Sequence, residues 1–191
     1  MVIFTPPPFG KRIRLPRLFF AAALGLCFMM AVTAVWNIFA VQTGYSASRS
    51  EYAELRDKYA PAMAAAPDET AAPAELDLTG VNPDYIGWLR IKGASVDYPV
   101  VRGQDNEKYL SATFMGENGK TGSIFMDYRC ESGFDSPYAI LYGHNAKDGT
   151  MFAELNRYAD PAWKDGHPEI TVTAPDGTAL VYRVFSVQGT D

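Results

Sequence analysis

The 191-residue chain has 22 acidic and 17 basic residues, which give it a net charge of −5 at pH 7. This balance disfavours a nucleic-acid partner, because proteins that bind the phosphate backbone carry a basic patch. The two cysteines lie more than 100 positions apart, Cys27 in an apolar run and Cys130 beyond it, so they indicate neither a disulfide framework nor a Cys-x-x-Cys metal or redox pair. The length fits one domain plus accessory segments.

The N-terminus has the pattern of a membrane anchor. Residues 1–17 contain four basic residues and no acidic one, and residues 18–41 follow without any charge. As a helix, this run would be about 36 Å long, enough to cross a bilayer core of roughly 30 Å. Basic residues before such a helix favour a cytoplasmic N-terminus. We therefore predict a cytoplasmic tail over 1–17, a single-pass transmembrane signal anchor over 18–41 in the cell membrane, and an extracellular remainder. A cleaved signal peptide is the alternative, although its apolar region usually spans only about 7–15 residues.

Residues 42–76 are predicted to form an extracellular helix and a linker. Tyr52, Leu55 and Tyr59 fall on one stripe at helical spacing, so residues 46–60 are expected to be a stalk or a helix packed on the domain. The Ala/Pro-rich composition of residues 61–75 is typical of a semi-rigid spacer.

From about residue 77 the sequence changes to short β-branched and aromatic runs separated by turn signals. Pro99 favours an edge strand or a bulge, and Pro175-Asp-Gly177 predicts a hairpin. Short helical segments are expected over 106–114 and 150–158. About six strands with only short helices between them predict a mainly β domain, a mostly antiparallel barrel or sandwich. The expected strands are 85–91, 96–101, 122–129, 138–142, 169–173 and 178–187.

His144 directly follows the predicted strand 138–142 and begins a glycine-containing loop. Catalytic groups are often found on loops that a rigid scaffold holds, and imidazole titrates near neutral pH. His144 is therefore a candidate catalytic residue, with a solvated surface histidine as the alternative. We interpret His167, in a polar turn, as structural, and Tyr142 as a packed aromatic residue.

Five segments occur in the order that class B sortases have them, and over residues 77–191 the chain resembles this branch of the sortase family. The resemblance implies a sortase-like β-barrel, incomplete here with about six of eight strands, that follows the transmembrane helix. It also implies a cysteine transpeptidase that joins secreted proteins to the cell wall of Gram-positive bacteria. The segments are Asn82–Ile91, Asp97–Val101, Asp105–Leu110, Gly122–Arg129 and Leu141–Asn145.

The resemblance assigns the catalytic histidine to His144 and a place along the sorting-signal groove to Asn106 and Leu110. Helix capping by Asn106 and core packing by Leu110 are the structural alternatives. In the family, the nucleophilic cysteine and an arginine come from the last two strands. Residues 1–191 contain no match to those strands, so we expect a C-terminally truncated chain that is inactive by itself. The implied partners are sorting-signal peptides and a cell-wall amine.

Two other functions stay open at this stage. The chain could be a non-catalytic, membrane-anchored module that binds peptides or assembles with a partner. It could also be an enzyme that uses Cys130 with His144, although no base or oxyanion donor is placed beside this cysteine by spacing. No cofactor is predicted, and no metal either, because Asp127, Asp135 and Asp148 lack the spacing of a calcium loop.

Overall fold

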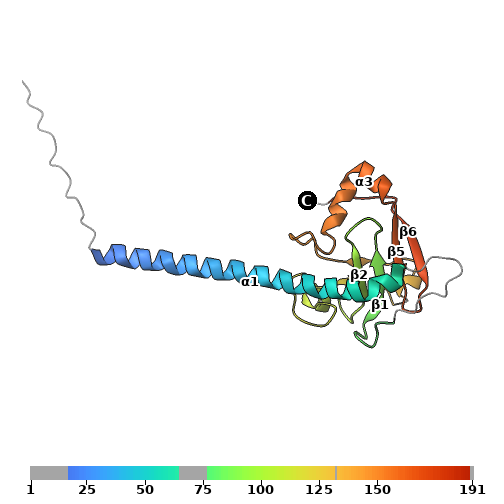
Figure 1. Ribbon diagram of the computed structural model, residues 1–191, viewed down its shortest axis with the longest axis horizontal. Helices are drawn as coiled ribbons and strands as arrows, with labels where there is room; N and C mark the ends of the chain where they lie inside the picture. The colour runs from blue at the N-terminus through green and yellow to red at the C-terminus, as the bar shows by residue number, and fades with distance from the viewer. Residues whose placement is uncertain (1–16, 65–76, 132, 190–191) are drawn as a thin grey trace, which may run out of the picture. The chain divides into compact units, whose positions relative to one another are not determined.

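The computed structural model describes residues 17–64, 77–131 and 133–189 (Figure 1). Two compact units divide the chain, Met1–Ala40 and Val41–Asp191. Helix α1, Arg17–Ala64, is one continuous helix of 48 residues that contributes to both units. It contains the predicted anchor and the predicted helix over 46–60, together with the first residues of the expected spacer. The rest of the spacer and the predicted basic tail up to residue 16 lie outside the described residues.

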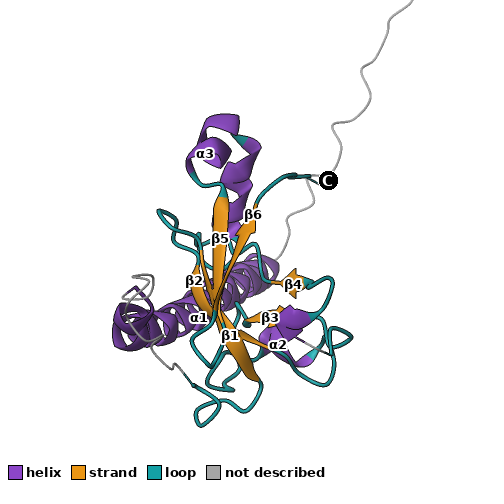
Figure 2. Ribbon diagram, turned by 90° about the vertical axis from the view of Figure 1, so that its right-hand side faces the viewer, coloured by secondary structure: helices purple, strands orange, loops and turns teal. Residues whose placement is uncertain are grey.

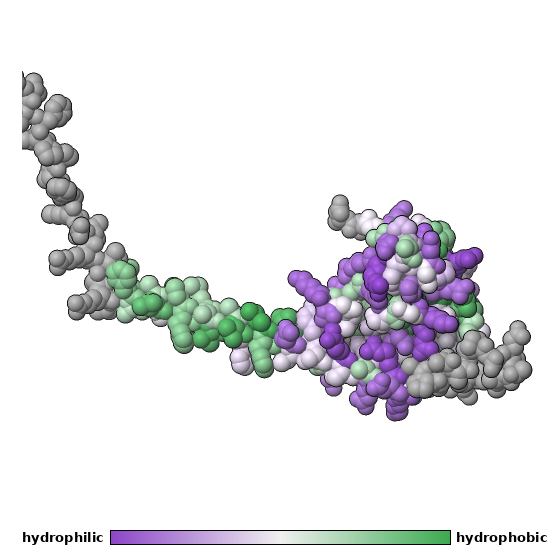
Figure 3. Space-filling model, turned by 45° about the horizontal axis from the view of Figure 1, so that its top comes forward, coloured by the Kyte–Doolittle hydropathy of each residue, from purple (hydrophilic) through white to green (hydrophobic). Residues whose placement is uncertain are grey.

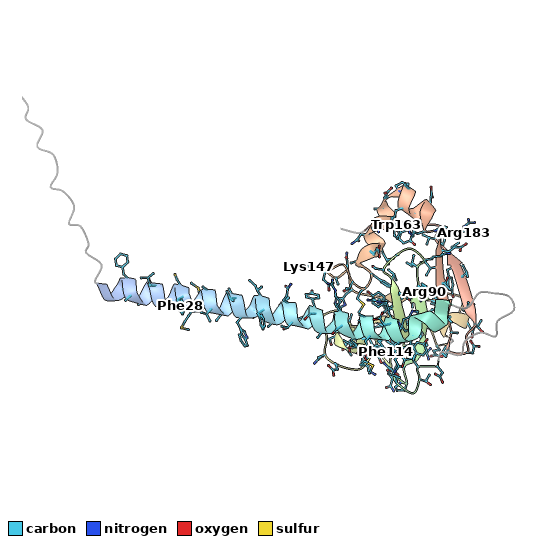
Figure 4. All side chains as sticks on the ribbon, viewed as in Figure 1. Phe28, Arg90, Phe114, Lys147, Trp163 and Arg183 are labelled. Carbon is cyan, nitrogen blue, oxygen red and sulfur yellow. The ribbon has the colours of Figure 1, made fainter. Side chains whose placement is uncertain are left out.

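The N-terminal part of α1 exposes apolar side chains on all of its faces. Figure 3 shows this part as a hydrophobic surface, and Phe28, labelled in Figure 4, is 71% exposed. Within the described residues, α1 is the one helix long and apolar enough to cross a membrane. An apolar helix with no protein packed around it is typical of a membrane span. The prediction of a long apolar N-terminal helix is therefore confirmed, and α1 is a candidate membrane span.

Six strands form one sheet in the order β4-β3-β2-β1-β5-β6, which curls into a half barrel (Figure 2). Every neighbouring pair is antiparallel except β2 and β3, which run parallel. Each strand lies within a predicted range, so the prediction of a mainly β domain with six strands is confirmed. The strands are β1 Tyr85–Arg90, β2 Asp97–Val101, β3 Ile124–Met126, β4 Leu141–Tyr142, β5 Glu169–Thr173 and β6 Ala179–Arg183.

The prediction of an edge strand at Pro99 is wrong, and the register shift of the β1–β2 pair lies between Tyr85 and Gly87 of β1 rather than at Pro99. β2 pairs with β1 on one side and with β3 on the other. The parallel ladder with β3 includes only Val100 and Val101 of β2. Pro99, which has no N–H to donate, therefore lies outside that ladder, and an interior strand can contain it.

The helices around the sheet are short. The segments predicted over 106–114 and 150–158 contain α2, Lys108–Ser111, and a 3₁₀ helix, Ala153–Ala159. Another 3₁₀ turn spans Gly133–Asp135. Helix α3, Pro161–Gly166, was not predicted, although the sequence at its start has an ordinary helix-start signal. The carboxylate of Asp160 accepts a hydrogen bond from the Ala162 N–H at 3.0 Å, just before a proline at the first helical position.

The docked part of α1, Val41–Ala64, belongs to the core of the second unit. Tyr52 and Leu55 are buried, as their helical spacing predicted. The Tyr52 hydroxyl donates to the carbonyl oxygen of Gly122 at 2.8 Å and accepts from the N–H of Phe114 at 3.2 Å. Its ring packs edge-on against Tyr98, with ring centroids 5.4 Å apart. This helix is thus packed on the domain rather than standing free as a stalk.

The parallel pairing of β2 and β3 requires a crossover, and this crossover contains Asn106 and α2. It closes at Gly122, whose φ of +57° strains any residue with a side chain. A Cβ at Gly122 would lie 2.7 Å from the carbonyl oxygen of Leu110. The next residue, Ser123, donates its N–H to the carbonyl of Tyr109 at 3.0 Å. A glycine is therefore needed where α2 packs against the start of β3.

Candidate active site

His144 lies in the loop that leaves β4, two residues after Tyr142. The residue is exposed, and its imidazole has no hydrogen-bond partner among the described residues. Its backbone is held firmly, because the carbonyl of His144 accepts a hydrogen bond from the Phe152 N–H at 3.0 Å. Among the described residues, the ring of His144 is thus exposed and unpaired, while its main chain is hydrogen-bonded.

The loop from Gly143 to Phe152 is closed by contacts at its base. A Cβ on Gly143 would lie 2.7 Å from Cδ2 of Phe152, so any larger residue has to displace that ring. Asn145 and Met151 form an isolated antiparallel bridge. Met151 is buried with a φ of +56°, and its N–H donates to the Tyr98 hydroxyl at 3.1 Å. These contacts fix both ends of the loop on the sheet.

Next to this loop, Asp127 follows β3 and is completely buried. Its carboxylate accepts hydrogen bonds from Arg129, through Nε at 2.9 Å and Nη2 at 2.7 Å, and from the Arg129 backbone N–H at 2.9 Å. It also accepts from Asn106 Nδ2 at 3.0 Å and from the Tyr142 hydroxyl at 2.9 Å. The pKa of Asp127 is held far below its usual range, mainly by the hydrogen bonds from Arg129. Asp127 is therefore an anion at neutral pH.

The structure brings Asn106 next to Asp127 and thus to the β3–β4 end of the sheet. Besides its bond to Asp127, Asn106 accepts the N–H of Tyr128 through Oδ1 at 3.1 Å. The backbone N–H of Lys108, the first residue of α2, donates instead to Oδ1 of Asp105 at 2.9 Å. Leu110 on α2 is 49% exposed and not a core residue. Neither structural alternative, helix capping by Asn106 or core packing by Leu110, describes these residues.

Sequence reasoning missed the roles of Tyr142 and Asp127. Tyr142 does pack against Phe125, with ring centroids 5.2 Å apart, but its hydroxyl is committed to the carboxylate. That hydrogen bond is the largest cause that raises the pKa of Tyr142. No local pattern signals this contact, because Asp127 and Tyr142 are 15 positions apart and meet through the pairing of β3 with β4.

Cys130 and His167 have surroundings that disfavour a catalytic role. Cys130 is buried and borders a cavity of about 200 Å³ beside Arg129. A buried thiol is a poor nucleophile for an external peptide. The ring of His167 stacks on Trp163 with centroids 4.0 Å apart, and its Nδ1 lies 2.8 Å from the Trp163 carbonyl. No group of three or more histidine, cysteine or acidic side chains in the described part of the chain is arranged to hold a metal ion.

Comparison with known proteins shows the family of the chain. The model of the sortase domain family matches residues 89–191. Sortase B of Listeria monocytogenes is 44% identical over 92 residues, which cover 48% of this chain and 37% of the relative. Sortase B of Staphylococcus aureus is 36% identical over 119 residues, which cover 62% of this chain and 48% of the relative. The aligned part of the chain thus spans less than half the length of either relative.

Solved structures match over a larger share. The S. aureus sortase B–substrate complex aligns with a TM-score of 0.63 at 33% identity, covering 74% of this chain and 64% of that one. Sortase B from B. anthracis in complex with AAEK1 aligns with a TM-score of 0.62 at 28% identity, and the alignment covers 76% of this chain and 69% of that one. The chain belongs to the sortase family, whose members are cysteine transpeptidases. Its relatives place it in class B, as the order of its motifs indicated.

Proposed function

We propose that this protein is a membrane-anchored transpeptidase. It would cleave a C-terminal sorting signal of secreted proteins and join them to a cell-wall amine through a thioacyl intermediate. One observation carries this proposal: in a sortase half barrel, the loop after β4 presents an exposed imidazole, that of His144, on a firmly held backbone. An exposed imidazole on a hydrogen-bonded main chain suits acid–base catalysis.

The chemistry divides into two acyl transfers. A cysteine thiolate attacks the scissile carbonyl, and His144 protonates the leaving amine, which leaves a thioester on the enzyme. The incoming wall amine then attacks the thioester and gives up a proton to His144, and the thiolate leaves. An arginine stabilises the oxyanion in both steps. We assign this cysteine and arginine to a part of the protein outside residues 1–191, as the family resemblance implies.

The sorting-signal peptide is assigned to the surface beside Asn106 and Leu110. Leu110 is half exposed and can offer apolar contact, and the amide of Asn106 lies at the same end of the sheet as Tyr142. The S. aureus relative has been solved with a substrate, which supports a peptide as ligand here. The apolar part of α1 would span the cell membrane, with the N-terminus in the cytoplasm and Val41–Asp191 outside.

The proposal is tested on the complete protein that the gene encodes, in detergent micelles. Reading the gene beyond codon 191 should reveal a strand containing a cysteine, followed by an arginine. A fluorescein-labelled pentapeptide library, with hydroxylamine as the acceptor, then measures acyl transfer. Because general acid–base catalysis contributes about 10²–10⁴-fold, His144→Ala should reduce turnover by at least about 100-fold. His167→Gln serves as the matched histidine control and should retain activity.

Each alternative predicts a different result. Peptide binding without any turnover by the complete protein would favour a non-catalytic anchored module. Loss of turnover in Cys130→Ala, with no second cysteine required, would favour an enzyme built on Cys130. Full activity in His144→Ala would contradict the proposed mechanism.

A further inference from the structure

One buried oxygen atom accepts hydrogen bonds from two segments at the β3–β4 end of the sheet, where the sorting-signal peptide is assigned. Oδ2 of Asp127 accepts both Nδ2 of Asn106, at 3.0 Å, and the hydroxyl of Tyr142, at 2.9 Å. Asn106 precedes α2, whereas Tyr142 ends β4, so segments more than 30 positions apart in the sequence share one acceptor. Asp127 is 0% exposed, and a bound peptide therefore does not reach the carboxylate itself.

The charge of this carboxylate is compensated without Asn106 or Tyr142. Arg129 binds it with both Nε and Nη2, and this guanidinium is itself largely exposed. A bidentate pair of this kind is strong and fixes the plane of the carboxylate. The bonds from Asn106 and Tyr142 are therefore not needed to neutralise a buried charge. They orient two side chains against a fixed anionic acceptor.

The contacts also determine which hydrogen-bonding atoms remain for a ligand. Oδ1 of Asn106 receives the backbone N–H of Tyr128, so its Nδ2 must be the atom that faces Asp127. One N–H of this amide is then left to donate. The Tyr142 hydroxyl uses its single proton on Asp127, so its oxygen is left to accept. A donor and an acceptor of this kind match the C=O and N–H groups of an extended peptide backbone.

We propose that Asp127 is a positioning residue, which holds Asn106 as a donor and Tyr142 as an acceptor for the main chain of the bound peptide. This inference rests on the proposed function, because it concerns the same peptide-binding surface. It adds a buried residue that touches neither substrate nor the reacting atoms, and it specifies which of two contacts donates to the peptide and which accepts from it. The ligand recognised there is peptide backbone and not a particular side chain.

The first experiment measures peptide affinity in the complete protein. The probe is the pentapeptide of the library that binds the wild type most tightly. Asp127→Asn should weaken its binding about tenfold or more, the usual effect of losing a charge-assisted hydrogen bond. Asp84→Asn is the matched control. Asp84 also accepts from a basic side chain, Lys108, and from a tyrosine hydroxyl, that of Tyr109, but it contacts neither Asn106 nor Tyr142. This control should bind within about twofold of the wild type.

A second measurement reads the polarity of the Tyr142 contact directly. Replacing single amide groups of the pentapeptide by esters removes one N–H at a time. One such ester should weaken binding to the wild type, and the same ester should have no further effect on Tyr142→Phe. In parallel, the NMR titration of ¹³C-labelled Tyr142 should show a raised pKa that returns toward its ordinary value in Asp127→Asn. The inference would be overturned if the ester weakened binding equally in the wild type and in Tyr142→Phe. It would also be overturned if the pKa of Tyr142 were the same in the wild type and in Asp127→Asn.

A third measurement covers the case in which Asp127→Asn does not fold. The substitutions Asn106→Ala and Tyr142→Phe should be non-additive in peptide affinity, because both act through one carboxylate. Additive effects would overturn the inference. If no pentapeptide binds the wild type, the proposed function fails and this inference with it. If peptides bind but Asp127→Asn binds as the wild type does, the inference alone fails.

Discussion

Arg49 donates a hydrogen bond from Nη2 to the backbone carbonyl of Asp148 at 2.8 Å, and the same nitrogen lies 3.7 Å from Oδ2 of Asp148. Asp148 lies in the loop that begins with His144, whereas Arg49 lies on the docked part of α1. The other carboxylate oxygen, Oδ1, accepts from the backbone N–H of Thr150 at 3.1 Å. The N-terminal helix therefore contacts the loop that presents the candidate catalytic histidine.

Replacing Arg49 by alanine should loosen this loop with little effect on global stability. The pair is largely exposed on the arginine side, and such pairs contribute about 0–1 kcal/mol. We expect faster hydrogen exchange at the backbone amides of residues 145–151, measured by mass spectrometry. Lys58→Ala, which removes a cation on the same helix that contacts Tyr59 instead, is the control. Equal exchange in both variants would show that Arg49 does not hold the loop.

Tyr52→Phe should destabilise the second unit by about 1–3 kcal/mol. The substitution removes a buried hydroxyl and leaves the Gly122 carbonyl and the Phe114 N–H without their partner. Urea unfolding followed by tryptophan fluorescence measures the change in the free energy of unfolding. Tyr59→Phe, on the same face of α1 but only partly buried, should change it by less than about 0.5 kcal/mol. A small effect at Tyr52 would mean that water replaces its hydrogen bonds.

Gly143→Ala should displace the loop that carries His144. The new methyl group would press against the buried side chain of Ile124 and the ring of Phe152. Forcing extra volume into a packed site costs about 1–3 kcal/mol. Thermal unfolding measures this cost, and the NMR signals of the His144 ring report the displacement. Gly166→Ala is the control, because a Cβ there meets nothing within 4 Å. Unchanged His144 signals in Gly143→Ala would contradict the expected displacement.

The stabilisation that Asp127 provides should disappear on acidification. Arg129 lowers the pKa of Asp127, so the folded state binds a proton less readily than the unfolded chain, whose aspartate pKa is about 3.9. The stabilisation is then complete above the unfolded pKa and decreases as the pH falls below it. Urea midpoints of the wild type and Asp127→Asn should differ by a constant amount between about pH 7 and pH 5. Below about pH 4 the difference should shrink; a difference that grows there would refute this assignment.

Much of the fold could be read from local patterns. The Tyr52 and Leu55 spacing predicted a buried helical stripe, and Pro175-Asp-Gly177 predicted the β5–β6 hairpin, whose turn the structure closes through Asp176 and Gly177. These features succeed because the residues that decide them are neighbours in the sequence. The continuity of α1 through residues 42–45 was not predicted, because the apolar run ends at residue 41 and these four residues carry no helical pattern of their own.

The site could be predicted only in part, because its key contacts join distant segments. The position of His144 after a strand was visible in the sequence. The bonds of Asp127 to Asn106 and Tyr142 span 21 and 15 positions and depend on the β2–β3 and β3–β4 pairings. The interior position of Pro99 likewise depends on how far β3 extends beside β2. The periodicity of a single strand does not show which strands pair, and these contacts follow from the order of the strands in the folded sheet.

The packing of Tyr52 and Leu55 of α1 on the second unit has a practical consequence for protein production. A soluble fragment that starts at residue 77 would omit Tyr52 and Leu55. It would uncover the ring of Tyr98, against which Tyr52 packs, and leave the backbone N–H of Phe114 without its partner. Such a fragment would be prone to aggregate during purification. Expression for crystallisation should instead begin near Val41, after the apolar part of the helix and before the residues that dock on the sheet.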